Sequence, residues 1–166
     1  MVNINYLARE NGSVIMMVRI AKGIWFASLL GAMAGLLYAY ASFPDPIQLS
    51  DGSDGTAQTV PRSQLFYAVL GLLGVFNALV FVVNRLMARG DDFFQAWFFG
   101  LVVFFNLFIL VSLQFFNLYN SGEKFDYSRI GFIVYGSVGL VIIWASLWPV
   151  SVIIQMIRPK RQVSQE

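Results

Sequence analysis

The fold of this chain is decided by "FFQAWFFGLVVFFNLFILVSLQFF", residues 93–116. This stretch contains no Asp, Glu, Lys or Arg, and phenylalanine is its commonest residue. A bilayer with a hydrocarbon core about 30 Å thick is crossed by a helix of about 20 apolar residues. The stretch therefore predicts a transmembrane helix.

Three further stretches have the same character, namely residues 24–41, 64–83 and 130–157. The chain of 166 residues is 58% hydrophobic and only 12% charged, which does not suit a surface that faces water. We therefore predict an all-α integral membrane protein in which residues 1–166 form one domain, a bundle of four transmembrane helices. The phenylalanine-rich surface of the third helix suits lipid or a large partner, and Trp144 and Trp148 suit an interfacial anchor at one end of the fourth.

The basic residues predict the orientation of the chain. Eight of the eleven Lys and Arg residues lie on one side of the predicted membrane: Arg9, Arg19, Lys22, Arg85, Arg89, Arg158, Lys160 and Arg161. By the positive-inside rule, both termini and the tail 158–166 are cytoplasmic, and the loops 42–63 and 117–129 face outward. We expect the membrane to be the bacterial cytoplasmic (inner) membrane. "AYAS", residues 39–42, also resembles the cleavage site of a signal peptide, but the basic leader is long for a signal, so we favour a retained span.

Two missing residue types narrow the chemistry. The chain has no cysteine and no histidine, which excludes disulfides, thiolate nucleophiles and the usual ligands of zinc and haem. The predicted spans contain no Asp, Glu, Lys or Arg, so the usual residues of proton-coupled transport and voltage sensing are missing. No basic patch with interleaved aromatic residues supports nucleic-acid binding. We assign no catalytic residue, no metal and no cofactor, and the only bound molecule that we allow for is lipid.

Polar side chains inside the predicted spans are few. Three amides stand out: Asn77, Asn106 and Gln114. Each is interpreted as an interhelical hydrogen bond, which contributes about 0.6 kcal/mol in a membrane, rather than as a ligand-binding group.

Small residues recur at helical spacing in three of the spans. They are Ala27, Gly31 and Gly35 in the first, Gly71, Gly74 and Ala78 in the second, and Gly136 and Gly139 in the fourth. Ridges of this kind let two helix backbones approach closely in lipid. We favour packing within the bundle, with homo-oligomerisation or docking to another membrane protein as the alternative.

Acidic residues gather in the two outer loops: Asp45, Asp51, Asp54, Glu123 and Asp126. An EF-hand that began at Asp51 would need a glutamate at its twelfth position, where this chain has Arg62. We therefore interpret residues 42–55, "SFPDPIQLSDGSDG", as a connector interrupted by Pro and Gly. The five acids stay candidates for a small polar cap.

The same loop also carries a resemblance. "FPDPIQLSDGSDG", residues 43–55, followed by "RSQLFY" and a glycine-rich second span, resembles the first outer loop of a bacterial membrane-domain family of unknown function. That family includes immunity proteins against the sporulation-delay peptide toxin. The residues that fall where its pattern would place them are Pro44, Asp45, Ile47, Asp54 and Gly55, whereas its usual histidine has no counterpart here. The resemblance implies a small polytopic protein that protects against or senses a peptide at the outer face of the membrane, and it does not imply an enzyme.

Two classes of function fit these observations. The first is a non-catalytic polytopic protein, either an accessory or scaffold subunit of a membrane complex or an immunity-like protein, which meets membrane lipids and a membrane-protein partner or further copies of itself. The second is a small membrane enzyme or transporter for lipid or peptide that uses the outer-face carboxylates.

Overall fold

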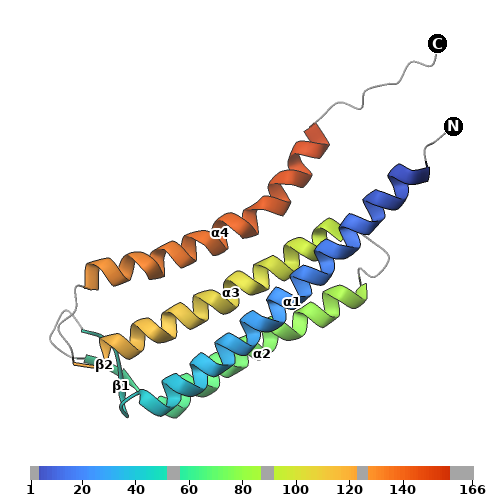
Figure 1. Ribbon diagram of the computed structural model, residues 1–166. Coiled ribbons are helices and arrows are strands. Elements are labelled where there is room, and N and C mark those ends of the chain that lie inside the picture. The colour runs from blue at the N-terminus through green and yellow to red at the C-terminus, as the bar shows by residue number, and fades with distance from the viewer. Residues whose placement is uncertain (1–3, 52–56, 87–91, 123–126, 158–166) are drawn as a thin grey trace.

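A computed structural model describes residues 4–51, 57–86, 92–122 and 127–157 of the chain (Figure 1). The elements are four helices, α1 (Ile4–Ser42), α2 (Arg62–Leu86), α3 (Asp92–Tyr119) and α4 (Tyr127–Ile157), and two strands, β1 (Ile47–Asp51) and β2 (Ala57–Val60). Each helix contains a segment that is long and apolar enough to cross a membrane. Four membrane-type helices are therefore confirmed. The first is longer than predicted, because α1 continues without a break into the leader.

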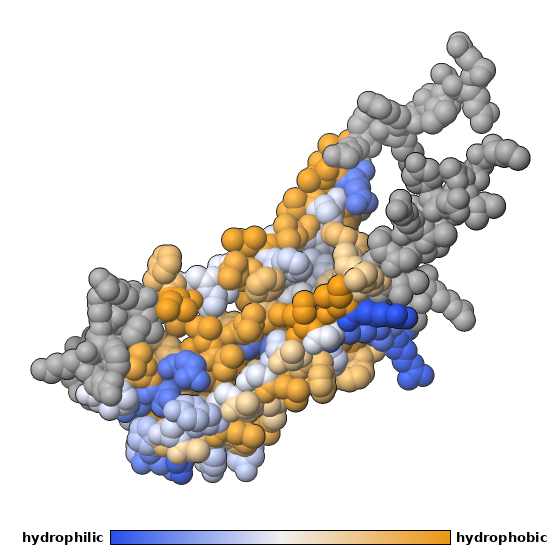
Figure 2. All heavy atoms as spheres, in the orientation of Figure 1, coloured by the Kyte–Doolittle hydropathy of each residue, from blue (hydrophilic) through white to orange (hydrophobic). Residues whose placement is uncertain are grey.

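The outward-facing surface of the helices is apolar. Figure 2 shows hydrophobic side chains along the length of the helices and hydrophilic ones mainly toward the two ends. Phe81 on α2 and Phe132 on α4, for example, are 67% and 77% exposed. Exposure of so many large apolar groups is unfavourable in water, so this surface suits the hydrocarbon of a bilayer.

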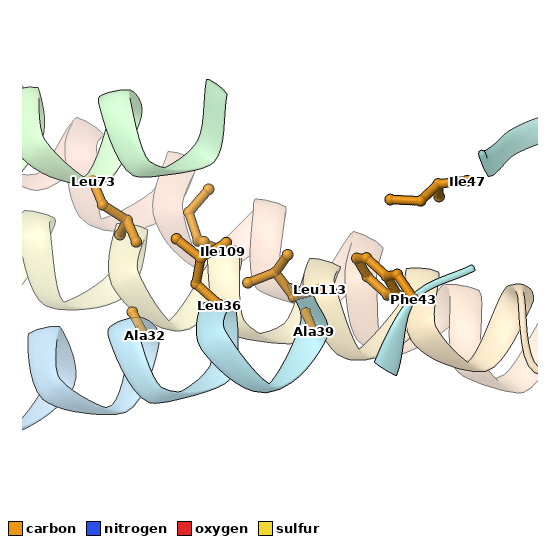
Figure 3. Packing of buried hydrophobic residues seen from close by; sticks show 8 residues of the cluster. All are labelled: Ala32, Leu36, Ala39, Phe43, Ile47, Leu73, Ile109 and Leu113. Atoms are coloured by element: carbon orange, nitrogen blue, oxygen red, sulfur yellow. The ribbon is translucent and has the colours of Figure 1, made fainter. Parts of the chain in front are cut away.

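The third helix is the central one. α3 packs against α1, α2 and α4. In Figure 3, Leu36 from α1 points toward Ile109 and Leu113 from α3, and all three are buried. The interpretation of the third span as a surface for lipid or a large partner was thus wrong. Hydropathy shows that a helix is apolar, but it does not show whether lipid or other helices cover the apolar side chains. In α3, side chains of three other helices cover part of them.

The fourth helix packs mainly against α3. No side chain between Gly131 and Ile157 is fully buried. Figure 1 shows α4 turning away from α3 in its last turns, and Pro149 lies within this helix. Proline lacks the N–H that a helix interior requires and bends the helix. α4 therefore joins the bundle mainly through α3, whereas α1, α2 and α3 all contact one another.

The segment between α1 and α2 contains a β-hairpin, which differs from the predicted all-α fold and simple connector. β1 and β2 pair antiparallel, with Ile47 opposite Val60 and Asp51 opposite Ala57. Ile47 is fully buried at the end of the bundle, beside the buried Phe43. Both strands are too short for alternation of apolar and polar residues to be recognised, and the intervening Gly and Asp residues favour a turn. The hairpin lies at the opposite end of the bundle from the start of α1 and the end of α4 (Figure 1).

Candidate functional site

Two asparagines connect the three central helices. Asn77 of α2 and Asn106 of α3 are 5% and 0% exposed. Asn77 Nδ2 donates to Asn106 Oδ1 at 2.9 Å, and Asn106 Nδ2 donates to Asn77 Oδ1 at 3.1 Å. From α1, Trp25 Nε1 donates to Asn77 Oδ1 at 2.8 Å, while Ser28 Oγ accepts from Asn106 Nδ2 at 3.1 Å. One polar network thus joins α1, α2 and α3.

The polar atoms of this network find their partners within the protein. Ser28 Oγ donates to the carbonyl of Trp25 at 2.8 Å, and Asn77 Nδ2 also donates to the carbonyl of Leu73 at 2.8 Å. Among the described side chains, no buried nitrogen or oxygen lacks a hydrogen-bond partner. The amide groups therefore hold helices together. Gln114, the third amide singled out in the sequence, is exposed.

A pair of tryptophans joins α3 to α4. Trp97 Nε1 donates to the carbonyl of Trp144 at 2.8 Å, and Trp144 Nε1 donates to the carbonyl of Trp97 at 2.9 Å. Gly100 makes room for this tryptophan pair, because a Cβ at that position would overlap the Trp144 indole. Trp148 packs beside Trp97, with 5.7 Å between the ring centres. The two α4 tryptophans that were interpreted as interfacial anchors therefore contribute to the contact between α3 and α4.

An apolar groove of about 480 Å³ lies beside the tryptophan pair. Met17 and Ile24 of α1 form one wall, Ala96 and Phe104 of α3 form the floor, and Leu147 of α4 contributes to the opposite wall. Its volume falls within the range of about 300–1,000 Å³ that is usual for small-molecule sites. No sequence pattern indicates this groove, because it depends on which helices are neighbours.

Most of the small-residue ridges face outward. Gly35 of α1 lies against Leu110 of α3, where an added Cβ would overlap the leucine. By contrast, among the described residues nothing outside the local helix backbone lies within 4 Å of a Cβ placed at Gly31, Gly71, Gly74, Gly136 or Gly139. Ala27 and Ala78 are exposed. In the part of the chain that the structure describes, Gly35 is thus the one glycine of the predicted ridges with a close contact to another helix.

Asn120 links the hairpin to the end of α3. Asn120 Oδ1 accepts from the Gln48 backbone N–H at 2.8 Å, and Asn120 Nδ2 donates to the Gln48 carbonyl at 3.0 Å. The same Nδ2 donates to the carbonyl of Phe116 at 2.9 Å. The Asn120 side chain thus bonds both the N–H and the carbonyl of Gln48 in β1, as the backbone of a neighbouring strand would.

Asp45 binds the N-terminus of α2. Its Oδ1 accepts from the backbone N–H of Arg62, the first residue of α2, at 3.2 Å. The Arg62 Nη1 donates to the Phe43 carbonyl at 3.1 Å, and its guanidinium lies 5.0 Å from the ring centre of Tyr40. These contacts tie together the end of α1 and the start of α2. The side chains of the other four candidate acids, Asp51, Asp54, Glu123 and Asp126, lie outside the described residues.

Comparisons with protein-family models, curated proteins and solved structures find no match to this chain. The resemblance of the first outer loop to the immunity-protein family stays a prediction.

Sequence reasoning and structure overlap only in part at these sites. Asn77 and Asn106 stand out in the sequence as polar residues in apolar spans, and the structure brings them together. The tryptophan pair and Gly100 were missed. One signal was available, because Gly100 is the only glycine in residues 93–116 and follows Trp97 by three positions, which places both on one side of a helix.

Proposed function

We propose that this chain is a non-catalytic polytopic membrane protein, an accessory or scaffold subunit that binds another membrane protein through open faces of α2 and α4. The observation that carries the proposal is the open space beside the glycines of those faces: among the described residues, nothing outside the local helix backbone lies within 4 Å of a Cβ placed at Gly74 or Gly139. Helices in lipid gain little from apolar burial and associate through close packing, which small residues permit. A glycine face that the chain itself does not cover is suited to a second protein.

The two sides of α2 illustrate the argument. One side carries the buried Leu73, Asn77 and Val80 and faces the bundle. Gly71 and Gly74 are exposed on another side of the same turns. The helix therefore has one side for its own chain and a smooth side that is free for a partner.

The proposed orientation places both termini in the cytoplasm of a bacterial cell and the hairpin outside it. Support comes from Arg19, Lys22 and Arg85, which are exposed at the end of the bundle away from the hairpin. Basic residues are retained on the cytoplasmic side of bacterial inner membranes. In this orientation the hairpin faces outward, which is also where an immunity-like protein would meet a peptide.

Site-specific photo-crosslinking in the native membrane tests the proposed function. A photoreactive amino acid replaces Val75 beside Gly74, Ile143 one turn after Gly139 or, as the control, Leu107 on α3, which are 60%, 63% and 42% exposed. The glycines themselves stay unchanged, so close packing on these faces is retained. We expect the Val75 and Ile143 positions to crosslink to one membrane protein, and the Leu107 position not to do so. Absence of a discrete crosslinked protein at both of these positions would contradict the proposal.

The alternative class of function predicts a different result. A membrane enzyme or transporter that uses outer-face carboxylates would lose its activity when all five acids are changed to their amides. The subunit that we propose would keep its crosslinks and its cellular phenotype in that variant. Comparison of the phenotype with that of a deletion strain therefore separates the two classes.

A further inference from the structure

The apolar groove has features of a built site. Met17 and Ile24 form its α1 wall, and the tryptophan pair lies along its α3 and α4 walls. Mutual hydrogen bonds fix the positions of Trp97 and Trp144, and Gly100 provides the space that the Trp144 indole fills. The groove is thus bounded on one side by two indole rings, Trp97 and Trp144, whose positions are fixed by hydrogen bonds.

The course of α4 keeps the groove open. Beyond the tryptophan pair, α4 contains Pro149 and turns away from α3 (Figure 1). The residues that follow, from Val150 to Ile157, include Ile153 at 54% and Met156 at 79% exposure. No helix of this chain closes the groove between α1 and α4, as far as the described residues show.

The lining selects a hydrocarbon occupant. Side chains such as Ile20, Val103 and Phe104 offer only carbon atoms. Both indole N–H groups of the tryptophan pair are already bonded to helix carbonyls. A stable water would need two to four polar partners, which these walls do not offer, whereas an acyl chain needs none.

The excess of basic residues at this end of the bundle favours an anionic lipid headgroup. Arg19 and Lys22 are exposed on α1 within the same turns as Met17 and Ile24, although on other sides of the helix. Arg85 is exposed in the last turn of α2 at this end. In the sequence, eight of the eleven Lys and Arg residues lie in or next to the helix ends on this side. Only four of the nine acidic residues do so, namely Glu10, Asp91, Asp92 and Glu166. An anionic headgroup at this level lies in a net positive field, and long basic side chains reach along the surface toward it.

We propose that the apolar groove binds an acyl chain of an anionic phospholipid, whose phosphate lies at the basic end of the bundle. The tail packs against the tryptophan pair, and the headgroup is attracted by Arg19 and Lys22. This site is independent of the open glycine faces on α2 and α4.

Tryptophan fluorescence of the full chain in vesicles tests the inference. The vesicles are phosphatidylcholine in which a fixed fraction is replaced by phosphatidylglycerol or phosphatidylcholine with brominated acyl chains, which quench tryptophans that they touch. We expect brominated phosphatidylglycerol to quench at a several-fold lower fraction. Equal quenching by the two lipids would overturn the proposal, because it would show only ordinary boundary lipid.

Two kinds of variant locate the effect. Ala96→Phe fills the groove and should remove the preference, whereas Ala68→Phe, on an exposed face of α2, should retain it. Arg19→Gln and Lys22→Gln lie on the surface and leave the groove intact, so they also report if Ala96→Phe does not fold. Each should lower the preference about fivefold, as expected for one charge near an anionic lipid. A preference that survives Ala96→Phe in a folded protein, or survives removal of both charges, would overturn the proposed site.

Discussion

At the scale of single residues, the described bundle depends on a few positions where the surroundings permit few residue types. Asn106 has hydrogen-bond partners on two other helices and is fully buried. Gly100 lies under the Trp144 indole. A polar group in lipid needs a partner, and a close contact needs space, so both positions constrain the residue type.

Replacement of Asn106 by leucine should destabilise the bundle. The substitution keeps the size of the side chain but leaves Asn77 and Ser28 without their shared partner. We expect a loss of about 1–2 kcal/mol in the free energy of unfolding. Reversible unfolding in mixed detergent micelles measures it, with Gln114→Leu on an exposed face as the control. Equal stability of the two variants would show that the network contributes nothing.

Gly100→Ala should loosen the attachment of α4 to α3. The added methyl group overlaps the Trp144 indole, and overpacking of this kind costs about 1–3 kcal/mol. The matched control is Gly136→Ala, since a Cβ at Gly136 meets open space. We expect a lower thermal midpoint and a changed near-ultraviolet tryptophan signal for Gly100→Ala only. A pair of variants with the same midpoint and spectrum would contradict this view of the tryptophan pair.

The same contrast applies to the first span. From the sequence alone, Gly31→Leu and Gly35→Leu are both expected to disturb assembly, because both residues belong to the small-residue ridge of the first span. The structure separates them, because Gly35 lies against Leu110 and Gly31 faces open space. We expect Gly35→Leu to lower the thermal midpoint of the isolated chain in mild detergent, and Gly31→Leu to leave it unchanged. A loss of stability in both would indicate that Gly31 packs against another chain.

At the scale of elements, the helices were predictable and the hairpin was not. Hydropathy identifies four spans because each needs about 20 apolar residues without charge. The hairpin is formed from short strands in a loop rich in Pro, Gly and Asp, and its position depends on Asn120, which is distant in sequence. No local pattern reveals a contact of that kind.

Asn120→Ala should release the hairpin while the bundle stays folded. The backbone N–H and carbonyl of Gln48 would lose their side-chain partner at the end of α3. We expect faster amide hydrogen exchange in β1 and unchanged exchange in α1 and α3. Asn117→Ala, one turn earlier on α3, serves as the control. Unchanged exchange at Gln48 in the Asn120 variant would show that burial of Ile47 alone fixes the hairpin.

At the scale of the whole molecule, the number of helices follows from the sequence but their arrangement does not. Hydropathy is nearly the same for a central helix and for one that faces lipid, so neither the central place of α3 nor the packing of α4 mainly against α3 can be read from it. Of the candidate sites, the asparagines could be selected because polar residues are rare in spans. The apolar groove could not, since it is formed by three helices together.

The orientation can be measured directly because the chain has no cysteine. A cysteine at Ser121, which is exposed near the hairpin end, should react with a membrane-impermeant maleimide in intact cells. A cysteine at Ser164, in the C-terminal tail, should react only after the cells are opened. The reverse pattern would contradict the proposed cytoplasmic termini.

The central claim is that this chain acts as a subunit bound to another membrane protein. The most direct measurement is the mass and composition of the particle released from the native membrane by gentle extraction of a tagged chain. We predict a larger complex with a second membrane protein in fixed stoichiometry, which a chain carrying leucine at Gly74 and Gly139 fails to retain. Recovery of the wild-type chain alone, with only lipid attached, would contradict the claim.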